Sequence, residues 1–172
     1  MSKPLAERMR PQSLDEMVGQ EQLTGPNGSL QRFIEQGRLP SIILWGPPGS
    51  GKTTLAHVIS KELNMRYFAL SAINTGVKEL RKVIIDAKDQ GLFNQQETLL
   101  FIDEIHRFNK GQQDALLEAV EKGQISLIGA TTENPSFAIN NALLSRCLIF
   151  QLKALNSEDL KALIERALEK DI

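Results

Sequence analysis

Residues 46–53 read Gly-Pro-Pro-Gly-Ser-Gly-Lys-Thr and fit the pattern G-x-x-x-x-G-K-[ST] at every fixed position. They follow the apolar run 41–45 and precede a segment with helical spacing of apolar residues at 53–64. This strand–loop–helix context predicts a loop whose backbone N–H groups, at the start of a helix, surround a phosphate group. The sequence therefore predicts a site for a nucleoside triphosphate.

Two side chains of this loop have predicted roles of their own. Lys52 would place a positive charge near the β- and γ-phosphates, and the hydroxyl of Thr53 is a predicted ligand for Mg²⁺. The predicted nucleotide-binding residues in and directly after the loop are Gly46, Pro47, Pro48, Gly49, Ser50, Gly51, Lys52, Thr53 and Thr54.

Bulk composition excludes several classes of protein. A length of 172 residues suits one domain with a real core. The net charge of −1 gives no global basic field, so a DNA contact would need a local patch. The single cysteine, Cys147, allows no disulfide within the chain, which fits a reducing compartment. The N-terminus lacks a signal-peptide core, and no run approaches the roughly 18 apolar residues of a membrane span, so we expect a cytoplasmic protein.

Short apolar runs alternate with helical patterns along the chain. This alternation predicts an α/β fold with a parallel sheet, and near-continuous apolar runs are expected of strands buried on both faces. The predicted strands are 41–45, 66–71, 97–102, 124–130 and 147–152. The predicted helices are 28–37, 53–64, 76–90, 110–122 and 139–145.

The two ends of the chain differ from this pattern. Residues 1–28 are polar and rich in Pro and Gly, and we interpret them as an arm rather than a core element. Residues 156–172 predict one amphipathic helix, which cannot bury its apolar stripe alone. We expect that it packs on the α/β body or that a further domain follows it. The predicted organisation is an α/β core over 1–155 and a separate segment over 156–172.

Two acids follow the apolar run 99–102. At the carboxyl end of a buried parallel strand, Asp103 is expected to face the phosphate loop and to contribute to the Mg²⁺ shell. Glu104 points elsewhere and is predicted to orient or deprotonate a water molecule.

Two more segments are candidates for the site. Small polar residues at 131–134 end the next predicted strand, where they would reach the γ-phosphate or form only a turn. Arg146 precedes the last predicted strand, and its pattern alone fits a surface residue, a structural ion pair or an arginine finger.

The remaining reactive residues favour simpler interpretations. His57 and His106 have no partners at metal-ligand spacing and are predicted to be packing or surface residues. Cys147 begins an apolar strand, which favours a buried, inert thiol. One predicted helix carries a basic side that is either a solvated face or a DNA-phosphate contact, formed by Lys78, Arg81, Lys82 and Lys88.

With these motifs in order, the chain resembles an AAA+ ATPase core, and most closely the replication-associated recombination protein A family. The most restrictive match is the pair of segments 105–110 and 131–137, because the phosphate-loop motifs are shared by many AAA+ proteins. The matching segments are 8–11, 17–21, 44–49, 101–110, 129–137 and 142–147.

The resemblance implies roles for individual residues. Residues 46–53 match Walker A, and Asp103 and Glu104 match Walker B. Thr132 matches sensor 1, with Asn134 as a second candidate, and Arg146 matches an arginine finger that acts on ATP held by a neighbouring subunit. Ser71 stands where clamp-loader relatives carry an asparagine that restrains the Walker B glutamate. The residues that match the segment bordering the adenine are Val18, Gly19 and Gln20.

The resemblance also implies a fold, an activity and partners. The fold would be a five-stranded parallel sheet in which one strand separates the Walker B strand from the P-loop strand. The activity would be Mg²⁺-dependent ATP hydrolysis, weak in this chain alone because the sensor 2 arginine and the oligomerisation domain of the family follow its core. Residues 156–172 match only the first helix of the lid, so most of the helical lid is missing. Implied partners of the full-length protein are single-stranded or forked DNA and further copies of itself in a homo-oligomer. Replication or single-strand-binding proteins at stalled forks are further implied partners. The implied location is the cytoplasm near the nucleoid, with no membrane partner.

Two alternatives compete with that function. A Holliday-junction branch-migration motor shares Gly-Ala-Thr-Thr at 129–132 but not the extension at 133–137. A clamp-loader-like binding module would respond to nucleotide and hydrolyse little. Turnover of ATP distinguishes the enzyme from the binding module.

Overall fold

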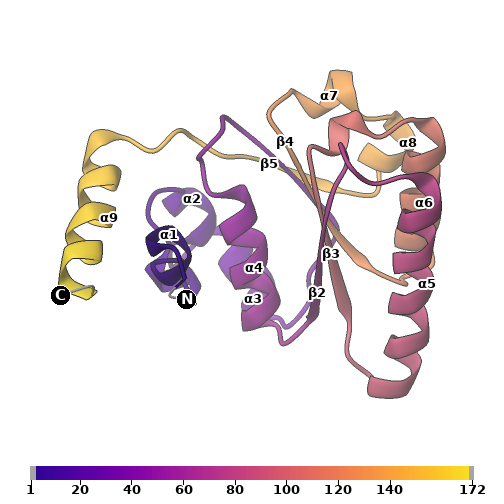
Figure 1. Cartoon of the computed structure of the whole chain (residues 1–172), viewed down its shortest axis with the longest axis horizontal. Coiled ribbons are helices and arrows are strands. Elements are labelled where there is room, and N and C mark those ends of the chain that lie inside the picture. Colours follow the sequence, from indigo (N-terminus) through magenta and orange to yellow (C-terminus); the bar gives the residue numbers. More distant parts are fainter. Residues whose placement is uncertain (1–2, 171–172) are drawn as a thin grey trace.

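The computed structural model describes residues 3–170. Within this range, five parallel strands form one sheet in the order β2-β3-β4-β1-β5 (Figure 1). Strand β4 lies between β1, which leads into the phosphate loop, and β3, which ends in Asp103, so the predicted sheet and its strand order are confirmed. The strands are β1 Ile42–Trp45, β2 Arg66–Ser71, β3 Thr98–Asp103, β4 Ser126–Thr131 and β5 Leu148–Gln151.

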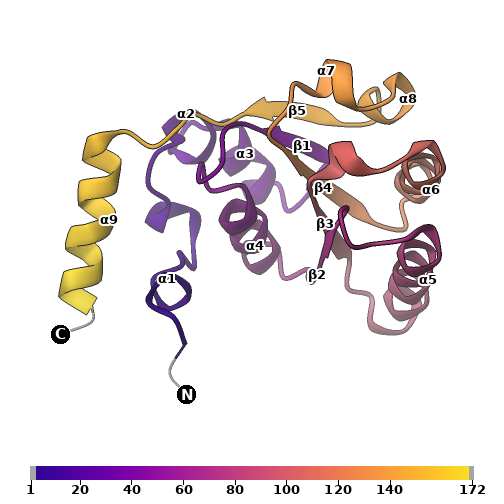
Figure 2. The same ribbon diagram turned by 45° about the horizontal axis from the view of Figure 1, so that its top comes forward.

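Helices cover both faces of the sheet. Helices α3 and α4 lie on one face and α5 and α6 on the other (Figures 1 and 2). Alternation along β1 shows the same division, because Ile42 and Leu44 belong to the cluster on the α4 side and Ile43 to the cluster on the α5 side. The covering helices are α3 Ser29–Glu35, α4 Lys52–Glu62, α5 Val77–Asn94, α6 Lys110–Glu121 and α8 Asn141–Leu144.

Position in the sheet decides how deeply a strand is buried. The inner strands β1, β3 and β4 are buried almost throughout, as their apolar runs predict. The expectation of burial on both faces is wrong for the edge strands, because Leu148 and Ile149 of β5 are each 43% exposed and β2 is only partly buried. An apolar run alone does not distinguish an edge strand from an inner one.

The interpretation of 1–28 as an arm outside the core is wrong for part of that segment. Leu14 and Leu23 are 3% and 5% exposed and belong to the core cluster on the α4 side. They are carried by two single turns, η1 Leu14–Glu16 and α2 Glu21–Thr24, after the short helix α1 Leu5–Arg8. Isolated leucines between polar turns have no periodicity, so no sequence pattern marks them as core residues.

Asparagine caps start two short helices before β5. The helix predicted at 139–145 is present as α8 Asn141–Leu144, and α7 Pro135–Ala138 precedes it in a segment where no helix is predicted. Asn134 Oδ1 accepts from the N–H of Ser136, and Asn140 Oδ1 accepts from the N–H of Leu143. Each cap starts a new helix, and α7 is the additional helix that the apolar pattern does not predict.

Helix α9, Ser157–Lys170, stands at one end of the molecule, beside α1 and α2 (Figures 1 and 2). Its apolar residues Leu160, Ile164 and Leu168 are 50–61% exposed. Arg166 Nη1 donates to the carbonyl oxygen of Glu16 at 2.6 Å. Positions 171–172 of the predicted segment lie outside the described residues. In the described range, no helix combines the length and apolar character needed to span a membrane.

Candidate active site

The phosphate loop connects β1 to α4, as its sequence context predicts. Gly51 caps α4 with φ +98°, a left-handed conformation that favours glycine over other residues. A side chain at Gly46 would bring its Cβ to 2.6 Å from the carbonyl oxygen of Leu152, so only glycine fits this close approach. The loop therefore presents backbone N–H groups at the N-terminus of an eleven-residue helix, where an anion is stabilised.

Lys52 is held inside the loop by three acceptors. Its Nζ donates to the carbonyl oxygens of Gly46 at 2.8 Å and Pro47 at 2.9 Å, and to Ser50 Oγ at 3.3 Å. Burial lowers the pKa of Lys52, while the carboxylates of Asp103 and Glu104 act in the opposite direction. The ammonium group is thus placed between the loop and the two acids.

A cavity of 490 Å³ opens where these segments meet. It brings together loop residues 48–54, Val18 from the N-terminal segment, and Asp103, Glu104 and Thr132 from the ends of β3 and β4. Leu155 and Leu163, from the chain before α9 and from α9 itself, also line it. Of the predicted site residues, all of which lie within 3–170, those that do not line this cavity are Gly19, Gln20, Gly46, Pro47 and Arg146.

Gln20 connects three segments beside the cavity. Its side chain is 5% exposed, and its Nε2 donates to the carbonyl oxygens of Ser50 at 3.2 Å and Lys153 at 2.6 Å. The N–H of Lys153 donates back to Gln20 Oε1 at 2.9 Å. The glutamine therefore fixes the phosphate loop to the N-terminal segment and to the chain that leads into α9.

The two acids at the end of β3 have different polar partners. Asp103 Oδ1 accepts from the N–H of Glu104 at 3.0 Å. Glu104 has φ +57°, which turns the chain out of the strand, and its Oε2 lies 3.2 Å from His106 Nε2. Ser71 pairs in register with Asp103, and within 3–170 no hydrogen bond joins Ser71 to Glu104. The residue in contact with the glutamate is His106.

The prediction of His106 as a packing or surface residue rather than a metal ligand does not include its polar partners. Its side chain is 7% exposed and both ring nitrogens have polar partners. Its partner Thr131 comes from a strand distant in sequence, so no spacing motif marks that contact. His57 does pack, with its ring edge-on to Tyr67 at 5.3 Å between centroids.

The polar residues at and after the end of β4 differ in exposure and in their contacts. Thr132 is exposed and lines the cavity with Asp103 and Glu104. Thr131 is 1% exposed and bonds to His106, while Asn134 is occupied as the cap of α7. Of the residues at 131–134, Thr132 is the one placed to meet a phosphate or a water in the cavity.

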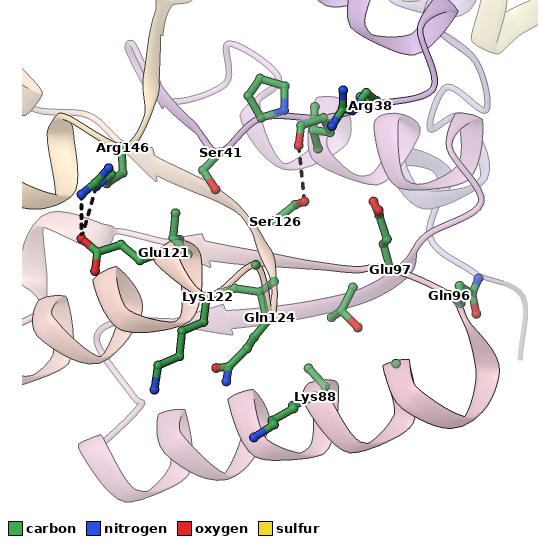
Figure 3. Close-up of a pocket in the computed structure, with 18 of the residues that line it drawn as sticks. Arg38, Ser41, Lys88, Gln96, Glu97, Glu121, Lys122, Gln124, Ser126 and Arg146 are labelled. Carbon is green, nitrogen blue, oxygen red and sulfur yellow. Dashed lines mark hydrogen bonds and ion pairs between the residues drawn. The ribbon is translucent and has the colours of Figure 1, made fainter.

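Arg146 lies at the opposite edge of the sheet. It lines a separate cavity of 840 Å³ with Ser41 and Ser126, which lie at the amino ends of β1 and β4 (Figure 3). Its Nη2 and Nε lie 3.1 and 3.2 Å from Glu121 Oε1 (Figure 3). The side chain is 56% exposed, so this arginine is at the surface, away from the phosphate loop of its own chain.

Cys147 follows Arg146 and is partly buried. Burial raises the pKa of its thiol to about 11, so the thiol stays protonated near neutral pH. The interpretation of Cys147 as an inert thiol is consistent with this environment.

The donor groups in the 490 Å³ cavity suit a magnesium ion shared with a phosphate. Within residues 3–170, no group of three or more His, Cys, Asp or Glu side chains is arranged to hold a metal. Asp103 contributes a carboxylate and Thr53 a hydroxyl to the same cavity. Mg²⁺ is commonly held by one or two protein oxygens together with substrate phosphates, so this small oxygen set fits it.

A family profile described as "ATPase family associated with various cellular activities (AAA)" matches residues 42–155. Replication-associated recombination protein A of Coxiella burnetii is 54% identical over 98% of this chain, and that of Escherichia coli K12 is 51% identical over 97%. The ATPase WRNIP1 of Dictyostelium discoideum is 51% identical over 96%. The chain spans 38%, 37% and 19% of the lengths of these three relatives.

Among solved structures, the RuvB Holliday junction branch migration motor of Thermotoga maritima is similar, with a TM-score of 0.77 and 34% identity. The similarity covers 95% of this chain and 55% of the RuvB chain. The solved structure thus supports the fold described above, and the family profile and the relatives identify an AAA domain.

Proposed function

This chain belongs to the AAA family of ATPases, and from that premise we propose that it binds ATP on residues 46–53 and hydrolyses it with Glu104 as general base. The observation that carries the proposal is one cavity that combines the loop, the two acids after β3 and Thr132. These groups come from separate parts of the sequence and meet at the carboxyl ends of parallel strands, where open α/β sheets bind ligands.

Binding would depend on the loop and on residues around its rim. Backbone N–H groups and Lys52 would hold the β- and γ-phosphates, while Val18 and the segment through Gly19 and Gln20 would border the adenine. Thr53 and Asp103 would hold Mg²⁺. When bound, Mg²⁺ supplies positive charge that offsets the charge developing on the phosphate oxygens.

The chemical step would depend on positioning. The Glu104 carboxylate would accept a proton from the attacking water, and the Thr132 hydroxyl would orient that water against the γ-phosphate. Both side chains line the same cavity as the loop. Electrostatic stabilisation by Lys52 and placement of the water would account for most of the rate.

Arg146 would complete the site of a neighbouring copy. It lies at the sheet edge opposite its own phosphate loop, and its partner Glu121 is 43% exposed. Such a surface ion pair contributes only about 0–1 kcal/mol, so the guanidinium could exchange it for a phosphate at little cost. A head-to-tail contact places this edge against the phosphate-loop edge of the next copy, and repetition of that contact builds an oligomer. Hydrolysis by this chain alone would then be slow.

We propose that ATP hydrolysis by the full-length protein drives the maintenance of stalled replication forks. The protein would act on single-stranded or forked DNA, in the cytoplasm at the nucleoid. Identities of 51–54% to replication-associated recombination proteins, against 34% to RuvB, support this assignment over branch migration. The basic side of α5 is a candidate DNA contact, because Lys78, Arg81, Lys82 and Lys88 are all exposed. Replication and single-strand-binding proteins are proposed partners.

Replacement of the general base tests the ATPase proposal. In the full-length protein with forked DNA, Glu104→Gln should retain ATP binding and lose about 10²–10⁴-fold in hydrolysis, the usual contribution of acid–base catalysis. Glu118→Gln is the matched control, because Glu118 is an exposed acid on α6. Equal ATP-dependent activity of Glu104→Gln and wild type would contradict the proposal.

Charge reversal tests the DNA contact separately. The triple change Lys78→Glu, Arg81→Glu and Lys82→Glu should weaken DNA binding and reduce the slope of log affinity against log salt. Lys161→Glu, on the exposed side of α9, serves as the control. Unchanged binding with an unchanged salt slope would remove α5 from the DNA-binding surface.

A further inference from the structure

A buried histidine joins the proposed general base to the neighbouring strand. His106 Nε2 lies 3.2 Å from Glu104 Oε2, and His106 Nδ1 lies 2.8 Å from Thr131 Oγ1. Glu133 Oε1 is also 3.8 Å from Nε2. Both ring nitrogens therefore have partners, one toward the base and one toward Thr131, the last residue of β4, which directly precedes the predicted sensor residue Thr132.

The chemistry of the partners fixes the direction of this chain of hydrogen bonds. A carboxylate only accepts, so the nitrogen that faces Glu104 carries the hydrogen. In the neutral ring, Nδ1 is then the acceptor and the Thr131 hydroxyl donates to it. The N–H of Glu133 donates to the same Thr131 Oγ1 at 3.0 Å. Hydrogen bonds thus connect the turn after β4 to the His106 ring, and a polar contact of 3.2 Å connects the ring to the Glu104 carboxylate.

Glu104 needs such a restraint. Its side chain has several rotatable bonds and is 29% exposed, and its own backbone is in the left-handed conformation directly after β3. A general base must lie within hydrogen-bond reach of the water it deprotonates, and a displacement of about 1 Å costs as much as 10²-fold in rate. The imidazole is 7% exposed and held on both sides, so it provides a fixed donor for one carboxylate oxygen.

We propose that His106 is a positioning residue that orients Glu104 and couples its orientation to the turn at residues 131–134. This inference rests on the proposed role of Glu104 as general base. Contact between Thr132 and the γ-phosphate would move the turn that includes the N–H of Glu133, and Thr131 and His106 would transmit that movement to the base. Ser71 has no part in this connection.

Two substitutions separate the halves of the connection. In His106→Gln, the side-chain amide reaches as far as Nε2 and can still donate to Glu104, whereas His106→Asn is shorter and reaches only toward Thr131. In single-turnover hydrolysis we expect a loss of about 10- to 100-fold for His106→Asn and about fivefold or less for His106→Gln, with ATP affinity unchanged in both. Equal rates for His106→Asn and wild type would overturn the inference, and so would an equal loss in both variants.

A double-variant comparison distinguishes this inference from the proposed function. If Glu104 is the base and His106 acts through it, adding His106→Asn to Glu104→Gln should cause no further loss of rate. A full further loss would show that His106 acts elsewhere and would overturn the inference while leaving the proposed function intact. Wild-type hydrolysis by Glu104→Gln alone would instead overturn the proposed function.

Nuclear magnetic resonance provides a readout that needs no activity and leaves His106 in place. The chain has two histidines, so His57→Gln leaves His106 as the sole imidazole. Imidazole ¹⁵N shifts should show hydrogen on Nε2, and Glu104→Gln should change the Nε2 shift while Glu118→Gln does not. Hydrogen on Nδ1 alone, or a spectrum insensitive to Glu104→Gln, would overturn the inference.

Discussion

The two edges of the sheet are built in opposite ways. At the carboxyl edge, Lys52 and His106 are held by hydrogen bonds, Glu104 lies 3.2 Å from His106, and Gln20 ties the phosphate loop to its surroundings. At the amino edge, Arg146 is 56% exposed and is held by Glu121, which is itself exposed. The first edge holds its polar groups by contacts from several segments, whereas the arginine at the second edge is held by an exposed ion pair.

This difference indicates how one catalytic site could be divided between two copies. Groups that must orient a water and a base gain from a rigid, buried setting. An arginine that must leave its own chain and reach a neighbour's phosphate gains from a weak, exposed ion pair. The contrast predicts that substitutions at the carboxyl edge affect the isolated chain, whereas Arg146 matters only when copies assemble.

The largest expected difference is in nucleotide binding by the isolated chain. Lys52→Ala should weaken ATP binding by about 10- to 100-fold, the equivalent of one charge-assisted hydrogen-bond set. Arg146→Ala should leave the affinity within about twofold, as expected of a surface change. Titration with a fluorescent ATP analogue measures both, and an equal loss in the two variants would break the comparison.

A smaller difference is expected in stability. Gln20→Ala leaves a buried carbonyl group of Ser50 and part-buried backbone groups of Lys153 without this partner and should lower the free energy of unfolding by about 2 kcal/mol. Glu121→Ala breaks an exposed ion pair and should cost about 0–1 kcal/mol. Urea denaturation gives both values. A cost for Glu121→Ala as large as that for Gln20→Ala would show that the amino edge is as firmly built as the carboxyl edge.

The smallest expected effect concerns Cys147, next to Arg146. Its pKa is raised to about 11 by burial, so the thiolate fraction at pH 8 is only about 0.1%. Alkylation by iodoacetamide should therefore be slow at pH 8 and should still increase between pH 9 and pH 10. A rate that levels off near pH 9, as for a free thiol, would show that the strand end at the amino edge opens in solution.

Features that depend on neighbouring residues could be predicted from the sequence. The loop at 46–53 between a strand and a helix, the acids at the end of β3 and the single strand that the family resemblance places between β1 and β3 all match the structure. Contacts between distant segments could not be predicted, because no local pattern encodes them. Thus His106, which follows β3, contacts Thr131 at the end of β4, and Gln20 bonds to Lys153, which is 133 residues away in the sequence. Leu14 likewise enters the core from a polar segment.

A mixing experiment tests the division of the site between copies most directly. Arg146→Ala and Glu104→Gln forms of the full-length protein are each expected to be inactive, with the arginine worth about 10³-fold or more. In a 1:1 mixture, about one head-to-tail interface in four joins an intact Glu104 to a neighbour's intact Arg146, so about a quarter of wild-type ATPase activity should return. A mixture that stays as inactive as the separate variants would contradict the account.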